Sequence, residues 1–188
     1  MPRFPMPRFL LRLCLFVLLV SAAISPGVSA ASLGIAAFEG VWRGSAVSES
    51  AISANFQMTS RDIDVTVRAG ANGGFSIVWN TVQRQKGDPN NPRAKLKSTT
   101  MQFASQRPGV WRAATNGDPL TAAKPYAWAY IKDRSLHIVT MQIYDDGRHE
   151  TQIYTRTLSG MGMQLEFSRN VDGEQVRQAS GRLVKAAK

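Results

Sequence analysis

Two histidines are the residues of this chain best suited to metal chemistry. His137 and His149 flank Asp145-Asp146-Gly147, a strong hairpin turn, so paired strands would bring the two imidazoles close together. With Asp146 or Glu150 nearby, they could hold a divalent metal. An exposed polar turn explains the same residues without a metal. We therefore expect no metal and no cofactor, and we keep the histidine pair as the alternative.

Chemistry that needs a strong nucleophile has no support in this sequence. The one cysteine, Cys14, lies within an N-terminal apolar run, and no Gly-x-Ser-x-Gly segment is present. No glycine-rich phosphate loop precedes a helix, which argues against nucleotide binding. The sequence therefore favours a binding protein over an enzyme. A small hydrolase or isomerase that uses polar groups inside the fold is kept as a third hypothesis.

Aromatic and methionine side chains are the main candidates for ligand contacts. Rings give a large apolar contact area, and methionine adapts to irregular ligands. If the fold is hollow, we expect a pocket for an apolar or amphipathic small molecule, lined by Trp79, Met101, Trp111, Tyr126, Trp128, Tyr130, Met141, Met163 and Phe167. Two alternatives stay open. These side chains could fill a solid core, and Tyr126, Trp128 and Tyr130 could instead form an exposed stripe for a partner.

The segments that carry these residues alternate apolar and polar side chains with a period of two, which is typical of β-strands. The clearest case is residues 61–68, where Ile63, Val65 and Val67 share one face. Tight turns separate about nine or ten such segments, and no long helix is predicted. We therefore predict an all-β fold, an up-and-down antiparallel meander of about 8–10 strands closed into a barrel, because closure removes exposed edges. A β-sandwich is the alternative.

The N-terminus is typical of a secretory signal peptide. Three arginines, Arg3, Arg8 and Arg12, accompany a short apolar run that ends in small residues before Ala30. We predict cleavage near Ala30 and a periplasmic or secreted protein with no transmembrane anchor after cleavage. An uncleaved anchor is the alternative, but the apolar run is shorter than the ~20 residues that a membrane span needs.

Cleavage divides the chain into three parts. Residues 1–30 would be the signal peptide, residues 31–37 a flexible lead-in and residues 38–185 a single barrel domain. Residues 48–59 fit a strand or an irregular crossover slightly better than a short lid helix, which is kept as the alternative. The mature chain would contain no cysteine, so its stability must come from a packed core rather than from disulfides.

The charge of the chain is strongly basic. The net charge is +10, and removing the three signal arginines leaves 20 Lys and Arg against 13 Asp and Glu, a net charge of +7. A basic exported protein could dock on an anionic surface of the envelope, so a non-catalytic envelope module is the second functional hypothesis. Export argues against nucleic acid as the partner.

The segment Gly40-Val41-Trp42 resembles the Gly-x-Trp motif in the first strand of lipocalins and their calycin relatives. The resemblance implies a small barrel around a pocket for a hydrophobic or amphipathic molecule. It also implies that Gly40 and Trp42 help to close one end of the barrel beneath an arginine from a late strand. Arg182 is the best match for that arginine and Arg177 is the alternate. An arginine stacked on an indole is worth about 0.5–2 kcal/mol. The sequence thus predicts an exported lipocalin-like binding protein.

Overall fold

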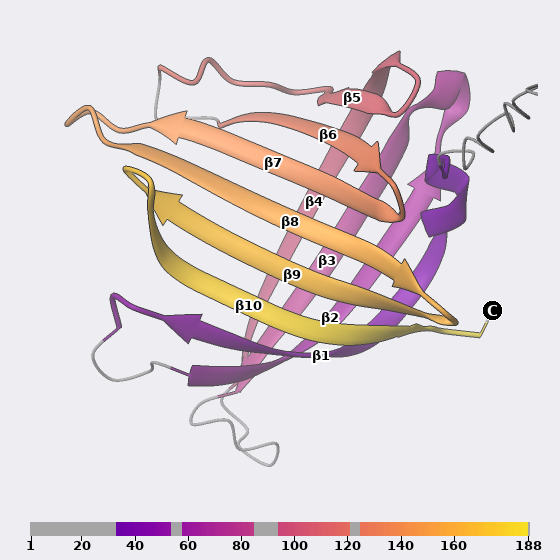
Figure 1. The fold of residues 1–188 in the computed structure, drawn as a ribbon, viewed down its shortest axis with the longest axis horizontal. Helices are drawn as coiled ribbons and strands as arrows, with labels where there is room; N and C mark the ends of the chain where they lie inside the picture. Colours follow the sequence, from indigo (N-terminus) through magenta and orange to yellow (C-terminus); the bar gives the residue numbers. More distant parts are fainter. Residues whose placement is uncertain (1–32, 54–57, 85–93, 121–124, 188) are drawn as a thin grey trace, which may run out of the picture. The chain divides into compact units, whose positions relative to one another are not determined.

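The computed structural model describes residues 33–53, 58–84, 94–120 and 125–187. Within these ranges, ten antiparallel strands form a closed barrel (Figure 1). Each strand pairs with its neighbours in sequence, and the first strand closes against the last. The strands are β1 (Gly40–Ser50), β2 (Met58–Ala69), β3 (Phe75–Arg84), β4 (Ala94–Arg107), β5 (Val110–Ala113), β6 (Tyr126–Lys132), β7 (Ser135–Ile143), β8 (His149–Ser159), β9 (Gly162–Val171) and β10 (Glu174–Lys185). The predicted all-β meander closed into a barrel is therefore confirmed.

The structure also describes part of the N-terminal lead-in. A short 3-10 helix, η1 (Ile35–Phe38), precedes β1, and both of its end residues are buried in the core. The lead-in expected over residues 31–37 is thus ordered at its C-terminal end. Residues 1–32, which include the predicted signal peptide, lie outside the described residues. No helix among the described residues is long and apolar enough to cross a membrane.

The segment 48–59 begins and ends in strands. β1 continues to Ser50, and β2 begins at Met58, so both ends of this segment enter the sheet. Residues 54–57, on which the lid-helix alternative depends, lie outside the described residues. The same holds for residues 85–93, which the sequence predicts as an exposed loop.

Apolar side chains fill one end of the barrel, which we call the Trp42 end. Trp42 is 4% exposed, and its Nε1 donates a hydrogen bond of 2.9 Å to the Phe38 carbonyl. Fully buried aliphatic residues from several strands pack around it, each worth roughly 1.5–3 kcal/mol of burial free energy. They include Val65, Val67, Ile77, Leu136, Ile138 and Leu183.

The cation beside Trp42 differs from the one that the resemblance implies. Lys185 is paired with Trp42 in the β1–β10 ladder, and its Nζ lies 5.3 Å from the centroid of the indole. Arg182 is paired with Ser45 and is exposed on the outer face. The reason is the period of two along β10, which turns Arg182 outward because its neighbour Leu183 faces inward. The alternate, Arg177, faces inward near the other end of the barrel.

Two glycines allow β1 to bend against β10. Gly40 begins β1 with a φ of +132°, a conformation that side chains rarely adopt. Gly181 lies opposite Ala46, and a Cβ atom there would be 2.3 Å from the carbonyl oxygen of Ser45. A side chain at position 181 would therefore push the two strands apart. Glycine at position 181 therefore allows the backbones of β1 and β10 to approach closely.

Candidate functional site

The inner face of the barrel changes from apolar to polar away from the Trp42 end. On β8 the inward positions run from Leu158 through Arg156 and Tyr154 to Gln152 and Glu150. The same change occurs on β2, where Val67 and Val65 give way to Ile63 and then to Arg61. We call the polar end of the barrel the cavity end.

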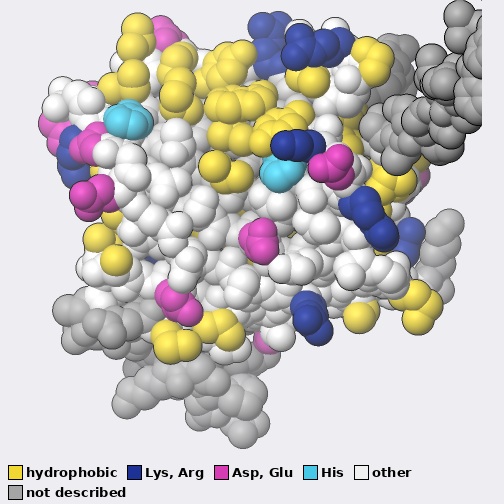
Figure 2. Space-filling view, in the orientation of Figure 1, with side chains coloured by type: hydrophobic (Ala, Val, Ile, Leu, Met, Phe, Trp, Pro, Cys, Tyr) yellow, Lys and Arg dark blue, Asp and Glu magenta, His cyan; other side chains and the backbone are white. Residues whose placement is uncertain are grey.

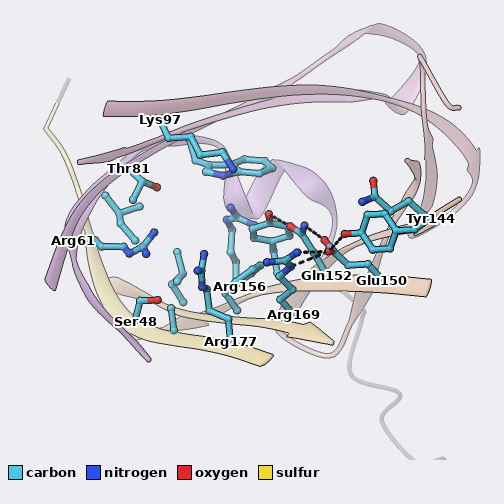
Figure 3. Close-up of a pocket in the computed structure, with 17 residues that line it drawn as sticks. Ser48, Arg61, Thr81, Lys97, Tyr144, Glu150, Gln152, Arg156, Arg169 and Arg177 are labelled. Carbon is cyan, nitrogen blue, oxygen red and sulfur yellow. Dashed lines mark hydrogen bonds and ion pairs between the residues drawn. The ribbon is translucent and has the colours of Figure 1, made fainter. Parts of the chain in front are cut away.

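A cavity of about 370 Å³ lies inside the cavity end (Figure 3). One part of its wall is aromatic and aliphatic. The Tyr154 ring contacts Trp79, with centroids 5.0 Å apart, and Phe167, with centroids 4.8 Å apart. Ile63, Leu165 and Ala179 complete the apolar part of the wall. The polar part of the lining is Ser48, Arg61, Thr81, Lys97, Gln142, Tyr144, Glu150, Gln152, Arg156, Arg169 and Arg177.

A hydrogen-bond network fixes one side of the cavity around Glu150, which is 3% exposed. Arg169 donates to this carboxylate from Nε at 2.8 Å and from Nη2 at 2.6 Å, and Tyr144 and Gln152 donate as well. Burial raises the pKa of Glu150, but the bonds from Arg169, Tyr144 and Gln152 outweigh it, and the net pKa is lowered. Burial raises the pKa of Tyr154 to about 12, and its hydroxyl donates to Gln152 at 2.7 Å.

Arg156 occupies the middle of the lining without a polar partner. It is 1% exposed, and its Nε and Nη1 have no hydrogen-bond acceptor among the described residues. Its guanidinium carbon lies 5.1 Å from the ring centroid of Trp79 and 5.8 Å from that of Tyr154. Burial lowers the pKa of Arg156 to about 10, and Tyr154 acts in the opposite direction. The group is therefore still positively charged at neutral pH.

A second group of cations lies across the cavity from Glu150. Burial lowers the pKa of Arg61, and the positive charge of Arg177 lowers it further. Arg177 Nε and the hydroxyl of Ser50 are buried without a hydrogen-bond partner among the described residues. An adjoining polar cavity of about 350 Å³ shares Arg61, Lys97 and Arg177 with the first, and none of its described lining residues is acidic. This side of the cavity is therefore electropositive.

Five of the nine predicted lining residues face inward, and they lie in two different parts of the barrel. Trp79 and Phe167 lie in the cavity wall. Trp111 and Met163 are instead buried in the apolar core, where Trp111 Nε1 donates to the Gly73 carbonyl at 2.7 Å. Met101 is partly buried and packs against that same core. These last three residues therefore belong to the filled part of the barrel rather than to the cavity.

Three predicted lining residues on β6 face away from the interior. Tyr126, Trp128 and Tyr130 are half-buried on the outer face, while Ala127 and Ala129 between them are 2% and 0% exposed. Met141 of β7 is paired with Tyr126 and shares this outer face. Figure 2 shows apolar side chains gathered over β6 and β7. The prediction that these four residues face inward is therefore wrong. Along this part of β6 the alanines face the core, and Met141 lies on the same outer face as its partner Tyr126.

The two histidines do not meet. His149 is paired with Ile143, while His137 is paired with Thr155, so roughly 20 Å of strand separates them. His137 Nδ1 lies 3.1 Å from the Thr155 hydroxyl, and His149 Nδ1 lies 3.2 Å from an Asp172 carboxylate oxygen. No group of three or more potential ligands that could hold a metal occurs among the described residues. The alternative of a metal site shared by the two histidines is therefore wrong. The turn at Asp146 sets a register of β7 and β8 in which the two histidines are not opposite each other.

Sequence reasoning missed the polar half of the cavity. Glu150, Gln152, Tyr154 and Arg156 alternate along β8 and share its inner face. Both faces of this strand are largely polar, so its hydrophobic pattern does not show which face is inward. The signal lies in the pairing of β8 with the clearly amphipathic β9, where Tyr154 lies opposite Phe167.

No protein-family profile matches this sequence, and no curated protein matches it. A crystal structure of a protein of unknown function from the DUF3598 family of Nostoc punctiforme is similar to this chain, with 12% identity and a TM-score of 0.53. The similarity covers 82% of this chain and 50% of that one, so the chain spans about half of its length. The S-type phycobiliprotein lyase of Guillardia theta has 11% identity and a TM-score of 0.39 over 83% of this chain and 94% of the lyase.

At such low identity the likeness to the DUF3598 protein shows the fold alone. The closed ten-stranded meander is compatible with the calycin-like barrel that Gly40-Val41-Trp42 led us to expect.

Proposed function

We propose that this protein binds an amphipathic small molecule in the cavity end of its barrel. The observation that carries the proposal is a cavity of about 370 Å³ with an aromatic wall on one part and charged side chains on another. This volume lies within the range of small-molecule pockets, roughly 300–1,000 Å³. Trp79, Tyr154 and Phe167 would contact the apolar part of the ligand, and the polar lining would contact its head group.

Binding without covalent change is the activity that suits this lining. Glu150, the one acidic residue among the described lining residues, is already held by Arg169 and Tyr144. Its lowered pKa keeps it ionised at neutral pH, where it lacks a proton to donate as a general acid. We therefore assign Glu150 a structural role in the cavity wall.

We further propose that the protein is an exported relative of the calycins. The basic N-terminus, the apolar run and the small residues before Ala30 support export, and the Gly40-Val41-Trp42 motif supports the kinship. N-terminal sequencing of the protein from its own host tests export. We expect the mature chain to begin at Ala31, and an intact N-terminus at Met1 would contradict this.

A fluorescent probe tests small-molecule binding directly. N-phenyl-1-naphthylamine is neutral and apolar, and we expect it to bind at one site with enhanced, blue-shifted emission. Ala179 faces the cavity between Ser48 and Phe167, so Ala179→Trp should fill the cavity and abolish binding. Ser180→Trp adds the same bulk at the next residue of β10, outside the cavity lining, and should bind like the wild type. Equal binding by both variants, or no binding by the wild type, would contradict the proposal.

A further inference from the structure

We propose that the ligand carries an anionic group, such as a carboxylate, sulfonate or phosphate, and that this group binds the guanidinium of Arg156 inside the cavity. The inference rests on the proposed function, because it names the chemical class of ligand for the same cavity. It assigns Arg156 as the residue that selects charged ligands over neutral ones of equal shape.

The Arg156 side chain is buried with polar atoms left unsatisfied by the described residues. Arginines are seldom fully buried without a partner, because desolvating the charge is costly. Arg156 is 1% exposed and lines the cavity, yet Nε and Nη1 have no acceptor among the described residues. Carboxylate, sulfonate and phosphate oxygens are strong acceptors for guanidinium N–H groups, and such an anion would also neutralise the buried charge.

The described residues supply no anion for Arg156. Glu150 is the one acidic residue among the described lining residues, and Arg169, Tyr144 and Gln152 occupy its oxygens. The Trp79 and Tyr154 rings attract the cation through their faces. Ring faces, however, leave the N–H groups at the edge of the guanidinium unsatisfied. A water molecule could accept from these groups, but it would not neutralise the charge.

Arg156 shares the cavity lining with several other cations. In Figure 3, Arg61 and Ser48 lie on one side of the cavity, Glu150 and Tyr144 lie on the other, and Arg156 lies between them. Apart from Arg169, the cations of the lining have no carboxylate partner among the described residues. Their field favours an anion anywhere in this space. Because Arg156 also contacts Trp79 and Tyr154, an anion bound to Arg156 would lie next to the aromatic wall.

A pair of probes with one skeleton separates charge from shape. 8-Anilinonaphthalene-1-sulfonate is N-phenyl-1-naphthylamine with an added sulfonate. We expect the wild type to bind the sulfonate more tightly than the neutral probe. Arg156→Met should weaken sulfonate binding at least tenfold and change neutral-probe binding less than about threefold. Arg156→Lys should restore part of the preference, since it keeps the charge but loses the planar guanidinium and its several N–H donors. Arg182→Met, on the outer face, serves as the control and should match the wild type.

The outcomes separate this inference from the proposed function. If the neutral probe binds the cavity but Arg156→Met leaves the preference for the sulfonate unchanged, only the inference fails. If neither probe binds the wild type, the proposed function fails as well. A direct measurement on the wild type does not depend on folding of the variants. We expect the nitrogen and proton resonances of Arg156 Nε to shift with the sulfonate probe and not with the neutral one. Identical shifts with both probes would overturn the inference.

Discussion

The two ends of this barrel are built from the same strands but serve opposite purposes. At the Trp42 end the inward residues are aliphatic or aromatic, and Trp42 itself is tied to Phe38 by a hydrogen bond. At the cavity end the same strands carry Arg61, Glu150 and Arg156, and a cavity remains between them. One end therefore supplies stability, while the other keeps charge and space that cost stability.

Removing the Trp42 indole should have the largest effect on stability, because this side chain packs in the filled end of the barrel. We expect Trp42→Ala to lower the free energy of unfolding by about 3–5 kcal/mol, the usual cost of emptying a large aromatic site. Chemical denaturation with circular dichroism measures it. Trp128→Ala removes the same side chain from the half-buried outer face and should cost less than half as much. Equal losses in the two variants would mean that the Trp42 end is not the main source of stability.

Replacing the unpaired cation at the cavity end should act in the opposite direction. Apolar residues in place of buried ions are often neutral or stabilising by about 1–4 kcal/mol. We therefore expect Arg156→Met to raise the midpoint of thermal unfolding of the ligand-free protein. A loss of stability greater than about 1 kcal/mol would show that Arg156 holds the fold together and would remove the contrast between the two ends.

The sequence could predict the barrel because most strands show one apolar face. Residues 61–68 display this pattern, and the structure buries Ile63, Val65 and Val67 as expected. For Tyr126 and its neighbours on β6 the inward prediction is wrong and the outward alternative fits, because large apolar rings do not by themselves show which face of a strand is inward. In the barrel, Ala127 and Ala129 take the inward positions instead.

The polar part of the cavity could not be predicted in the same way. Arg61, Glu150, Arg156 and Arg177 come from β2, β8 and β10 and share no local motif. Their meeting depends on the strand register and on closure of the barrel, which join residues far apart in the chain. The resemblance to calycins placed Trp42 in the closed end, but not the choice of Lys185 as its cation.

The Glu150 network tests whether the cavity end has any stabilising polar structure. Since hydrogen bonds keep the net pKa of Glu150 below its ordinary value of 4.5, its contribution is complete above about pH 4.5 and is lost as the pH falls through the lower folded-state value. We expect Glu150→Gln to cost about 1–3 kcal/mol at pH 7. The difference in unfolding free energy between Glu150→Gln and the wild type should shrink below pH 4.5. Urea denaturation at pH 7, 4.5 and 3 measures this, and a constant difference would contradict it.

The smallest expected effect concerns the exposed cation at the cavity end. Lys97 lies on the rim of both cavities and has no ion pair among the described residues. Lys97→Ala should change stability by less than about 0.5 kcal/mol.

Lys97→Ala should nevertheless slow association of the sulfonate probe at low salt, because the positive field at the cavity attracts anions before contact. The effect should fade as salt shortens the screening length to about 8 Å at physiological strength. Stopped-flow fluorescence measures it, with Arg112→Ala on the outer face as the control. Equal slowing by both variants would show that overall net charge, rather than the cavity end, attracts the ligand.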